Sequence, residues 1–193
     1  YYTAYNANTG MMAEWNTHNG PAAWIGIAMA HYTEKFNDPR YLGSMIEIGN
    51  ALVGLQNSDG SIPMSPADKT ISTEHNIDDY VFLRYLGSKI QGNNAYKEAG
   101  DRVAGWLKNT AYIKQEGRFV KGVRADGAMD YGVATDVQAW GASIAKDLGL
   151  DPKDFIRFVE SQGCAVEVTY NGQLVKGFDF TNKAMRDAAG RQP

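Results

Sequence analysis

Nine residues from Ser72 to Tyr80, STEHNIDDY, combine carboxylates with an imidazole directly ahead of an apolar run. Two carboxyl groups that flank a glycosidic bond can hydrolyse it, because one gives a proton to the leaving oxygen while the other activates water. Crowding among carboxylates raises the pKa of one of them, which keeps that group protonated for the acid role. Glu74, His75 and Asp78 are therefore candidates for catalysis.

The same segment is also typical of a helix start. If Asn76 is the N-cap, Asp78 and Asp79 occupy the first turn, where negative charge meets free amides and the helix dipole. Capping then explains Asn76 and Asp79 without any chemistry, and Asp79 is expected to be a solvated or capping neighbour of Asp78. A cap that opens on a cleft can also bind sugar, so Asn76 remains a candidate for substrate binding.

Two further loops carry carboxylates together with aromatic residues. The segment AEWNTHNGP holds Glu14 and Trp15, and the segment DYGVATDVQAW holds Tyr131, Asp136 and Trp140. Aromatic faces stack on the apolar side of a sugar ring, and carboxylates bind its hydroxyls. Asp136 is either the cap of a helix or a second catalytic carboxylate, and the remaining four are candidates for substrate binding.

These candidates precede helices of a repeated helical hairpin. A helix that is apolar nearly all round is followed by an amphipathic one, and Tyr41 and Tyr96 in successive amphipathic helices are 55 residues apart. The pattern predicts three pairs of inner and outer helices, at about 20–56, 76–109 and 134–162. All inner helices then run in one direction, so their N-termini and the preceding loops open on one face.

The pattern changes period near the C-terminus. Alternating residues around Asn171-Gly172, a strong hairpin signal, predict a two-stranded β-hairpin at about 165–179. Asp151-Pro152 predicts the start of the third outer helix, with the aspartate as cap and the proline as first helical residue. The expected fold class is all-α with this one small β-hairpin, in a single domain over 1–193.

The motifs GP.AWI.IA, NDPRYL and STEHNIDDY resemble those of the six-hairpin glycosidase superfamily, whose members are α/α toroids. Within it, the chain is similar to bacterial proteins that carry a STEHN-x-D-x-Y segment. In that pattern Asp78 is the matching aspartate, and it aligns with Gln138 of the third repeat. Six hairpins at this period need about 330 residues, so the resemblance implies about half of a toroid, with a substrate cleft at the N-terminal ends of the inner helices.

The function implied is that of a glycoside hydrolase acting on an oligo- or polysaccharide. Glu74 is the expected acid because it is crowded by other carboxylates, and Asp136 is the expected base. One alternative is a polysaccharide lyase or an unsaturated-glycoside hydrolase, in which His75 acts as base or donor on an acidic sugar. The other is a non-catalytic toroid that binds a glycan or a protein.

Composition argues against several other classes of function. A net charge of −3, a pI near 5.6 and the absence of any Lys/Arg run argue against nucleic acid and anionic membranes as partners. The apolar runs are too short to cross a bilayer, so no membrane association is predicted. Cys164 is the only cysteine, and neither a metal-binding spacing nor a cofactor fingerprint is present, so no metal site or cofactor is predicted.

Overall fold

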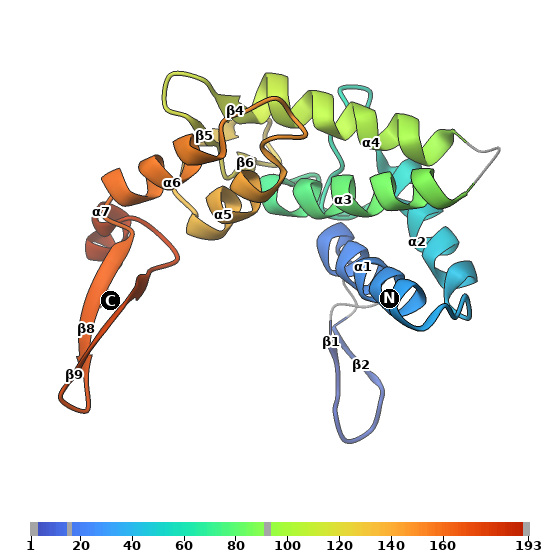
Figure 1. Ribbon diagram of the computed structural model, residues 1–193, viewed down its shortest axis with the longest axis horizontal. Helices are drawn as coiled ribbons and strands as arrows, with labels where there is room; N and C mark the ends of the chain where they lie inside the picture. Colours follow the sequence, from blue (N-terminus) through green and yellow to red (C-terminus); the bar gives the residue numbers. More distant parts are fainter. Residues whose placement is uncertain (1–3, 15–16, 91–93, 191–193) are drawn as a thin grey trace.

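The computed structural model describes residues 4–14, 17–90 and 94–190, and its helices form three hairpins arranged in an arc (Figure 1). The first pairs α1 (Asn19–Phe36) with α2 (Leu42–Leu55). The second pairs α3 (Thr73–Lys89) with α4 (Ala95–Trp106), which continues as the π-helical turn η1 (Leu107–Ala111). The third pairs α5 (Thr135–Ile144) with α6 (Pro152–Ser161). The predicted alternation of inner and outer helices is thereby present.

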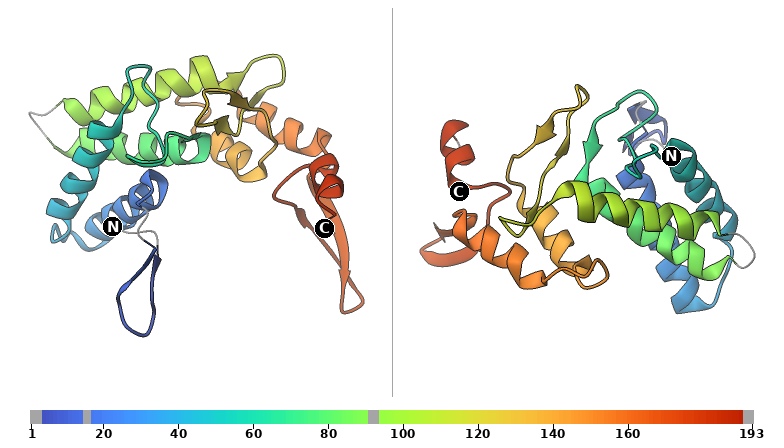
Figure 2. Two further views of the ribbon diagram at one scale, coloured as in Figure 1. Left: turned by 180° about the vertical axis from the view of Figure 1, so that it is seen from behind. Right: turned by 90° about the horizontal axis from the view of Figure 1, so that it is seen from above.

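The inner helix α3 lies at the centre of the arc, between α1 and α5 (Figure 2). Its apolar side chains are buried around most of its circumference, including Tyr80, Phe82, Leu83 and Leu86. Close packing against α1 depends on Gly26, because a Cβ atom there would lie 2.4 Å from the Phe82 ring. The core therefore runs along α3, and the outer helices close it from the other side.

The outer helices follow the sequence pattern closely. In α4 the buried side chains Tyr96, Val103 and Trp106 recur at helical spacing while charged residues face solvent. In α6 Asp151 is the N-cap and accepts a hydrogen bond from the Lys153 amide at 2.9 Å, with Pro152 as first helical residue. The start predicted for the third outer helix is confirmed.

The helix α3 begins at Thr73, three residues earlier than predicted. Ser72 is the N-cap, and its hydroxyl accepts a hydrogen bond from the His75 amide at 3.4 Å. Asn76 is not a cap: it is fully buried within the first turns of the helix. Glu74 and His75 therefore belong to the first turn of α3. The sequence pattern had predicted that they lie in the loop before the helix.

Short strands occupy the long connections between the helical hairpins. The strands β3 (Ile71–Ser72), β6 (Gly122–Val123) and β7 (Met129–Asp130) form an antiparallel sheet in the order β3-β6-β7, and β4 (Tyr112–Ile113) pairs with β5 (Arg118–Phe119). Gly122 is required in this sheet, since a Cβ atom there would lie 2.1 Å from the Ile71 carbonyl oxygen. The three-stranded sheet is therefore held close to the N-terminal end of α3.

Two β-hairpins project from the helical body on the same side (Figure 1). One is formed by β1 (Ala4–Tyr5) and β2 (Met12–Glu14), the other by β8 (Ala165–Tyr170) and β9 (Gln173–Phe178). Positive φ angles at Asn171 (50°) and Gly172 (76°) confirm the tight turn predicted between β8 and β9. The short helix α7 (Lys183–Ala188) follows, and none of the helices in the described ranges is long and apolar enough to span a bilayer.

Buried amide side chains tie the preceding loops to the inner helices α3 and α5. Asn76 accepts from the Ile62 amide at 2.8 Å and donates to the Ile62 carbonyl at 2.9 Å. Gln138 makes the same pair of bonds with Phe119, both at 3.0 Å. Each is the fourth residue of its helix, so Gln138 corresponds to Asn76 and not to Asp78 as the sequence alignment had it. The sequence alignment was therefore two residues out of register on α3.

Candidate functional site

Equivalent positions on the three inner helices meet at the inside of the arc. Trp24, Asp78 and Trp140 are each the sixth residue of their helix, and Glu74 and Asp136 are each the second. Trp24 and Trp140 are 44% and 38% exposed, and their rings pack edge to face with centroids 5.5 Å apart. The inner face thus presents two indoles beside carboxylates from α3 and α5.

The carboxylates of this cluster influence one another. Burial raises the pKa of Asp78 to about 7, and the Glu74 charge adds to this, while a hydrogen bond from the Trp24 side chain opposes it. Burial also raises the pKa of Glu74, with a further contribution from the charge of Asp136. These interactions place Glu74 within electrostatic range of both Asp78 and Asp136, as the three were expected to be. The name acid cluster is used below for Glu74, Asp78 and Asp136.

Asp136 is held at the start of α5. It lies in the first turn of the helix and accepts a hydrogen bond from the Val137 amide at 2.7 Å. Its side chain is half-buried. The acid cluster thus combines a carboxylate held at a helix N-terminus with another, Asp78, whose raised pKa disposes it to keep a proton near neutral pH.

Asp79 is not the solvated or capping residue predicted. It is fully buried, and its Oδ2 accepts a hydrogen bond of 2.6 Å from Asn19 Nδ2 at the start of α1. Burial raises the pKa of Asp79 well above its usual value, against the effect of the Asn19 bond. The prediction failed because α3 starts earlier than expected. Asp79 is then the seventh residue of the helix, beyond the first turn, and its side chain faces α1.

Asn19 also contacts His75, which connects α1 to the first turn of α3. His75 Nδ1 lies 2.8 Å from Asn19 Oδ1, and burial, reinforced by the nearby His18, lowers the pKa of His75 to about 4. The ring fits against α1 only because residue 20 is glycine: a Cβ atom there would lie 2.5 Å from His75 Cδ2. His75 is therefore a neutral imidazole held against the α1 N-terminus.

A pocket of about 350 Å³ opens beside this first turn, and it is called the rim pocket below. Glu74 and His75 line it on the helix side, and Lys121, Arg124 and Asp130 line it on the side of the β3-β6-β7 sheet. Glu74 belongs to both the rim pocket and the acid cluster. A ligand in the rim pocket would therefore extend toward the carboxylates of the inner face.

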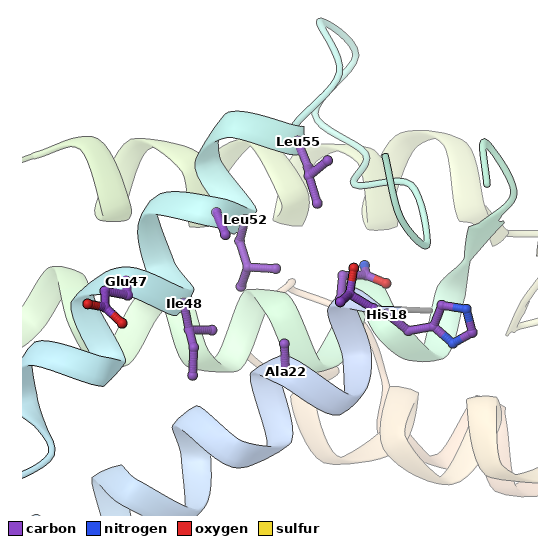
Figure 3. Close-up of a pocket in the computed structure, with 9 residues that line it drawn as sticks. His18, Ala22, Glu47, Ile48, Leu52 and Leu55 are labelled. Atoms are coloured by element: carbon purple, nitrogen blue, oxygen red, sulfur yellow. The ribbon is translucent and has the colours of Figure 1, made fainter. Parts of the chain in front are cut away.

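A second hollow of about 280 Å³ lies between α1 and α2 (Figure 3). Its walls are mostly apolar, with Ala22, Ile48, Leu52 and Leu55 labelled in the figure, and His18 lies at the right-hand side of this view. The acid cluster does not line it. We therefore take the rim pocket and the acid cluster, and not this groove, as the candidate site.

The other predicted substrate-binding residues lie in different surroundings. Tyr131 is 61% exposed in the connection between β7 and α5, while Asn76 is wholly used in the core and cannot contact a ligand, which corrects that prediction. Trp15 lies outside the described residues, and of Glu14 only the backbone, at the end of β2, is described. For these two the expectation stands as a prediction.

Two residues of the site were missed from the sequence. Trp24 was assigned to a helix buried all round, yet it is partly exposed and hydrogen-bonds Asp78. Asn19 was treated as part of a loop. Only the helix starts that the structure shows align Trp24 with Asp78 and Trp140. Nothing in the sequence pattern marks Asn19, because its role depends on the contact between α1 and α3.

Within the described ranges, no three or more His, Cys, Asp or Glu side chains are grouped so that they could hold a metal ion.

Known protein structures resemble this chain, although sequences do not. No model of a known protein family matches, and no curated protein sequence is significantly similar. A glycoside hydrolase family 76 mannosidase from Bacteroides thetaiotaomicron matches with a TM-score of 0.58 and 11% identity, over 80% of this chain and 47% of that one. The α-1,6-mannanase of Salegentibacter sp. HEL1_6 matches with a TM-score of 0.60 and 18% identity, over 86% and 52%.

A further match is an inactive variant of the Salegentibacter mannanase, with two adjacent aspartates replaced by asparagine, in complex with α-1,6-mannotriose. Its TM-score is 0.60 at 18% identity, and 81% of this chain and 50% of that one are covered. These similarities confirm the predicted fold: the chain has the helical-hairpin arrangement of part of an α/α toroid. It spans about half the length of the solved structures that it matches.

Proposed function

We propose that the chain carries part of the active site of a glycoside hydrolase. The observation that supports this most is the acid cluster itself, in which Asp78 has a pKa raised to about 7 beside two partly exposed indoles. A general acid works best when its pKa lies near the working pH. The sequence led us to expect Glu74 as the acid, but we assign this role to Asp78. Burial and the charge of Glu74 together raise the pKa of Asp78 to about 7.

In the proposed reaction Asp78 gives its proton to the glycosidic oxygen as the bond to the sugar carbon breaks. Asp136, at the first turn of α5, takes the opposite role and accepts a proton from the water molecule whose oxygen forms the new bond to that carbon. Only 5% of Asp78 is exposed, and the Trp24 indole hydrogen-bonds its carboxyl group. The sugar is therefore expected to approach Asp78 beside Trp24. Trp24 and Trp140 then supply faces for stacking.

The matched structures suggest the substrate to test first. They include a mannosidase, an α-1,6-mannanase and its complexes with α-1,6-linked mannose oligosaccharides. Two adjacent aspartates are replaced in the inactive variants, and Asp78-Asp79 is the only pair of adjacent aspartates in this chain. We therefore propose α-linked mannooligosaccharides as substrates, with both aspartates needed: Asp78 as acid and Asp79 as the buried support of the α1–α3 contact.

The test is hydrolysis and binding of α-1,6-mannotetraose by the chain and by Asp78→Asn. We expect turnover to fall by about 10² to 10⁴-fold while the dissociation constant changes less than about threefold, since the amide keeps the shape of the carboxyl. Asp101→Asn, at an exposed carboxylate of α4, is the matched control and should retain turnover. Binding with no turnover in the unmodified chain would instead support the non-catalytic alternative.

One observation favours the lyase or unsaturated-glycoside hydrolase as a second candidate. Lys121, Arg124 and His75 line the same rim pocket, so a uronic acid carboxylate could bind the two cations beside a neutral imidazole base. Under that alternative the chain would act on a uronic acid polymer and not on mannotetraose. A rise in the ultraviolet absorbance of unsaturated uronides would indicate a lyase, and a fall in that absorbance on unsaturated oligosaccharides would indicate an unsaturated-glycoside hydrolase; neither change is expected of a mannan hydrolase.

A further inference from the structure

We propose that Asn19 is a positioning residue that fixes the tautomer of His75, so that His75 Nε2 accepts a hydrogen bond from a ligand hydroxyl in the rim pocket. That the ligand is a sugar rests on the proposed function. The tautomer of His75 rests only on the geometry of the contact between α1 and α3. It assigns the rim pocket a polar acceptor that is uncharged, in contrast to the carboxylates of the acid cluster.

The amide of Asn19 has a donor end and an acceptor end, and both are engaged. Its Nδ2 donates to Asp79 Oδ2 at 2.6 Å, and its Oδ1 faces His75 Nδ1 at 2.8 Å. The side chain is 2% exposed, so water does not compete for either end. A buried amide in this position is held in one orientation by its partners.

The ionisation of Asp79 bears directly on this orientation. When ionised, the carboxylate can only accept hydrogen bonds, so it requires the NH2 end of Asn19, as in the structure. Asn19 then turns its carbonyl oxygen toward His75. A proton on Asp79 Oδ2 would reverse the amide and place the ring proton of His75 on Nε2, so an Nε2–H tautomer is the outcome that contradicts this arrangement.

A carbonyl oxygen opposite Nδ1 requires a proton on that nitrogen. Burial keeps the imidazole neutral, because the pKa of His75 is lowered to about 4, so the single ring proton resides on Nδ1 and Nε2 has a free lone pair. In the described part of the chain, Nε2 has no hydrogen-bond partner, and His75 lines the rim pocket. Gly20 leaves the ring the space to lie in this orientation.

The rim pocket can then bind a sugar hydroxyl in both of its hydrogen-bonding roles. A hydroxyl donates one hydrogen bond and accepts others. His75 Nε2 provides the acceptor, while Lys121 and Arg124 provide donors on the opposite wall. A group that can only accept, such as an ether oxygen or a fluorine, could not use Nε2. The ligand class favoured here is therefore a sugar with a free hydroxyl at this position.

The experiment is a long-range 1H–15N correlation spectrum of the 15N-labelled chain at pH 7, which shows which imidazole nitrogen carries the proton. The three histidines are assigned with His75→Gln, His18→Gln and His31→Gln. We expect His75 as the Nδ1–H tautomer. An Nε2–H tautomer for His75 in the unmodified chain would overturn the inference.

Asn19→Leu tests the role of the amide itself. The leucine is close in size but cannot accept from Nδ1, so the His75 spectrum should change toward the Nε2–H tautomer, and binding of mannotetraose should weaken about 5- to 10-fold. An unchanged Nδ1–H signal in a folded Asn19→Leu chain would refute the positioning role. If the chain hydrolyses nothing, the proposed function fails but the inference about His75 does not, because the tautomer of His75 is measured without substrate.

Discussion

Asp78 is a residue of the acid cluster whose burial opposes folding once its carboxyl group ionises. Its pKa is about 7 in the folded chain against 3.8 for an exposed aspartate, so between these values the folded state binds more protons than the unfolded state. Stability contributed by this group is present below about pH 4 and is lost as the pH rises to about 7. A destabilised carboxyl on a cleft wall is common where activity requires it.

We therefore predict that Asp78→Asn stabilises the chain at pH 7, by about 2 to 4 kcal/mol at about 1.4 kcal/mol per pKa unit. The difference in unfolding free energy between Asp78→Asn and the unmodified chain should grow from pH 4 to pH 7. The buried His75, whose lowered pKa removes stability as the pH falls toward 4, contributes to both chains and cancels in this difference. Denaturant titrations at several pH values measure it.

Asp101→Asn serves as the control for this measurement. Asp101 is exposed and paired with Lys97 in α4, so its replacement should change the unfolding free energy by less than about 1 kcal/mol at every pH. A destabilised Asp78→Asn chain at pH 7 would show that the carboxylate is stabilised in the folded state, contrary to its burial.

At the scale of elements, the inner helices are held to their loops by buried amides. Asn76 satisfies both backbone groups of Ile62, and Gln138 satisfies both of Phe119. Replacing Asn76 or Gln138 by leucine leaves two buried backbone groups without partners, and we predict a loss of about 2 to 4 kcal/mol in each case. The two losses should be nearly equal because the geometries match.

Chemical denaturation measures these losses, and hydrogen exchange at the Ile62 and Phe119 amides localises them. Gln115→Leu, at an exposed glutamine before β5, is the matched control and should change stability by less than about 0.5 kcal/mol. Leucine variants of Asn76 and Gln138 as stable as this control would mean that the loops are held by other contacts.

The sequence predicted elements better than it predicted side-chain orientations. Apolar periodicity located the helical hairpins, and Asn171-Gly172 located the β-hairpin, because both signals are local. The start of α3 was wrong because Ser72, Asn76 and the first-turn carboxylates all satisfy capping rules, and only the contact of Asn76 with Ile62 decides among them. Trp24 and Asn19 were missed for the same reason: their partners lie on α3, about 55 to 60 residues away in the chain.

At the scale of the molecule, several large apolar side chains among the described residues are exposed, and two groups of them bear on function and assembly. One is the inner face, with Trp24 and Trp140, and the other is the β8–β9 hairpin, with Tyr170 and Phe178 exposed by more than half. The inner face belongs to the candidate site. The hairpin does not, and its six cross-strand pairs all lie within the hairpin itself, so the helical body has little need of it.

We predict that shortening this hairpin leaves the fold intact. Replacing residues 167–176 by an Asn-Gly turn keeps the pairs next to the body, Ala165 with Phe178 and Val166 with Gly177, and removes the exposed apolar tip. The unfolding free energy of the shortened chain should stay within about 1 kcal/mol of the full chain, because almost no buried apolar surface is lost. Sedimentation velocity should show less self-association, since contiguous exposed apolar surface favours it. A loss of several kcal/mol would instead mean that the hairpin packs on the helices in solution, and the pairing between Arg186 of α7 and Asp179 after β9 would be the first contact to examine.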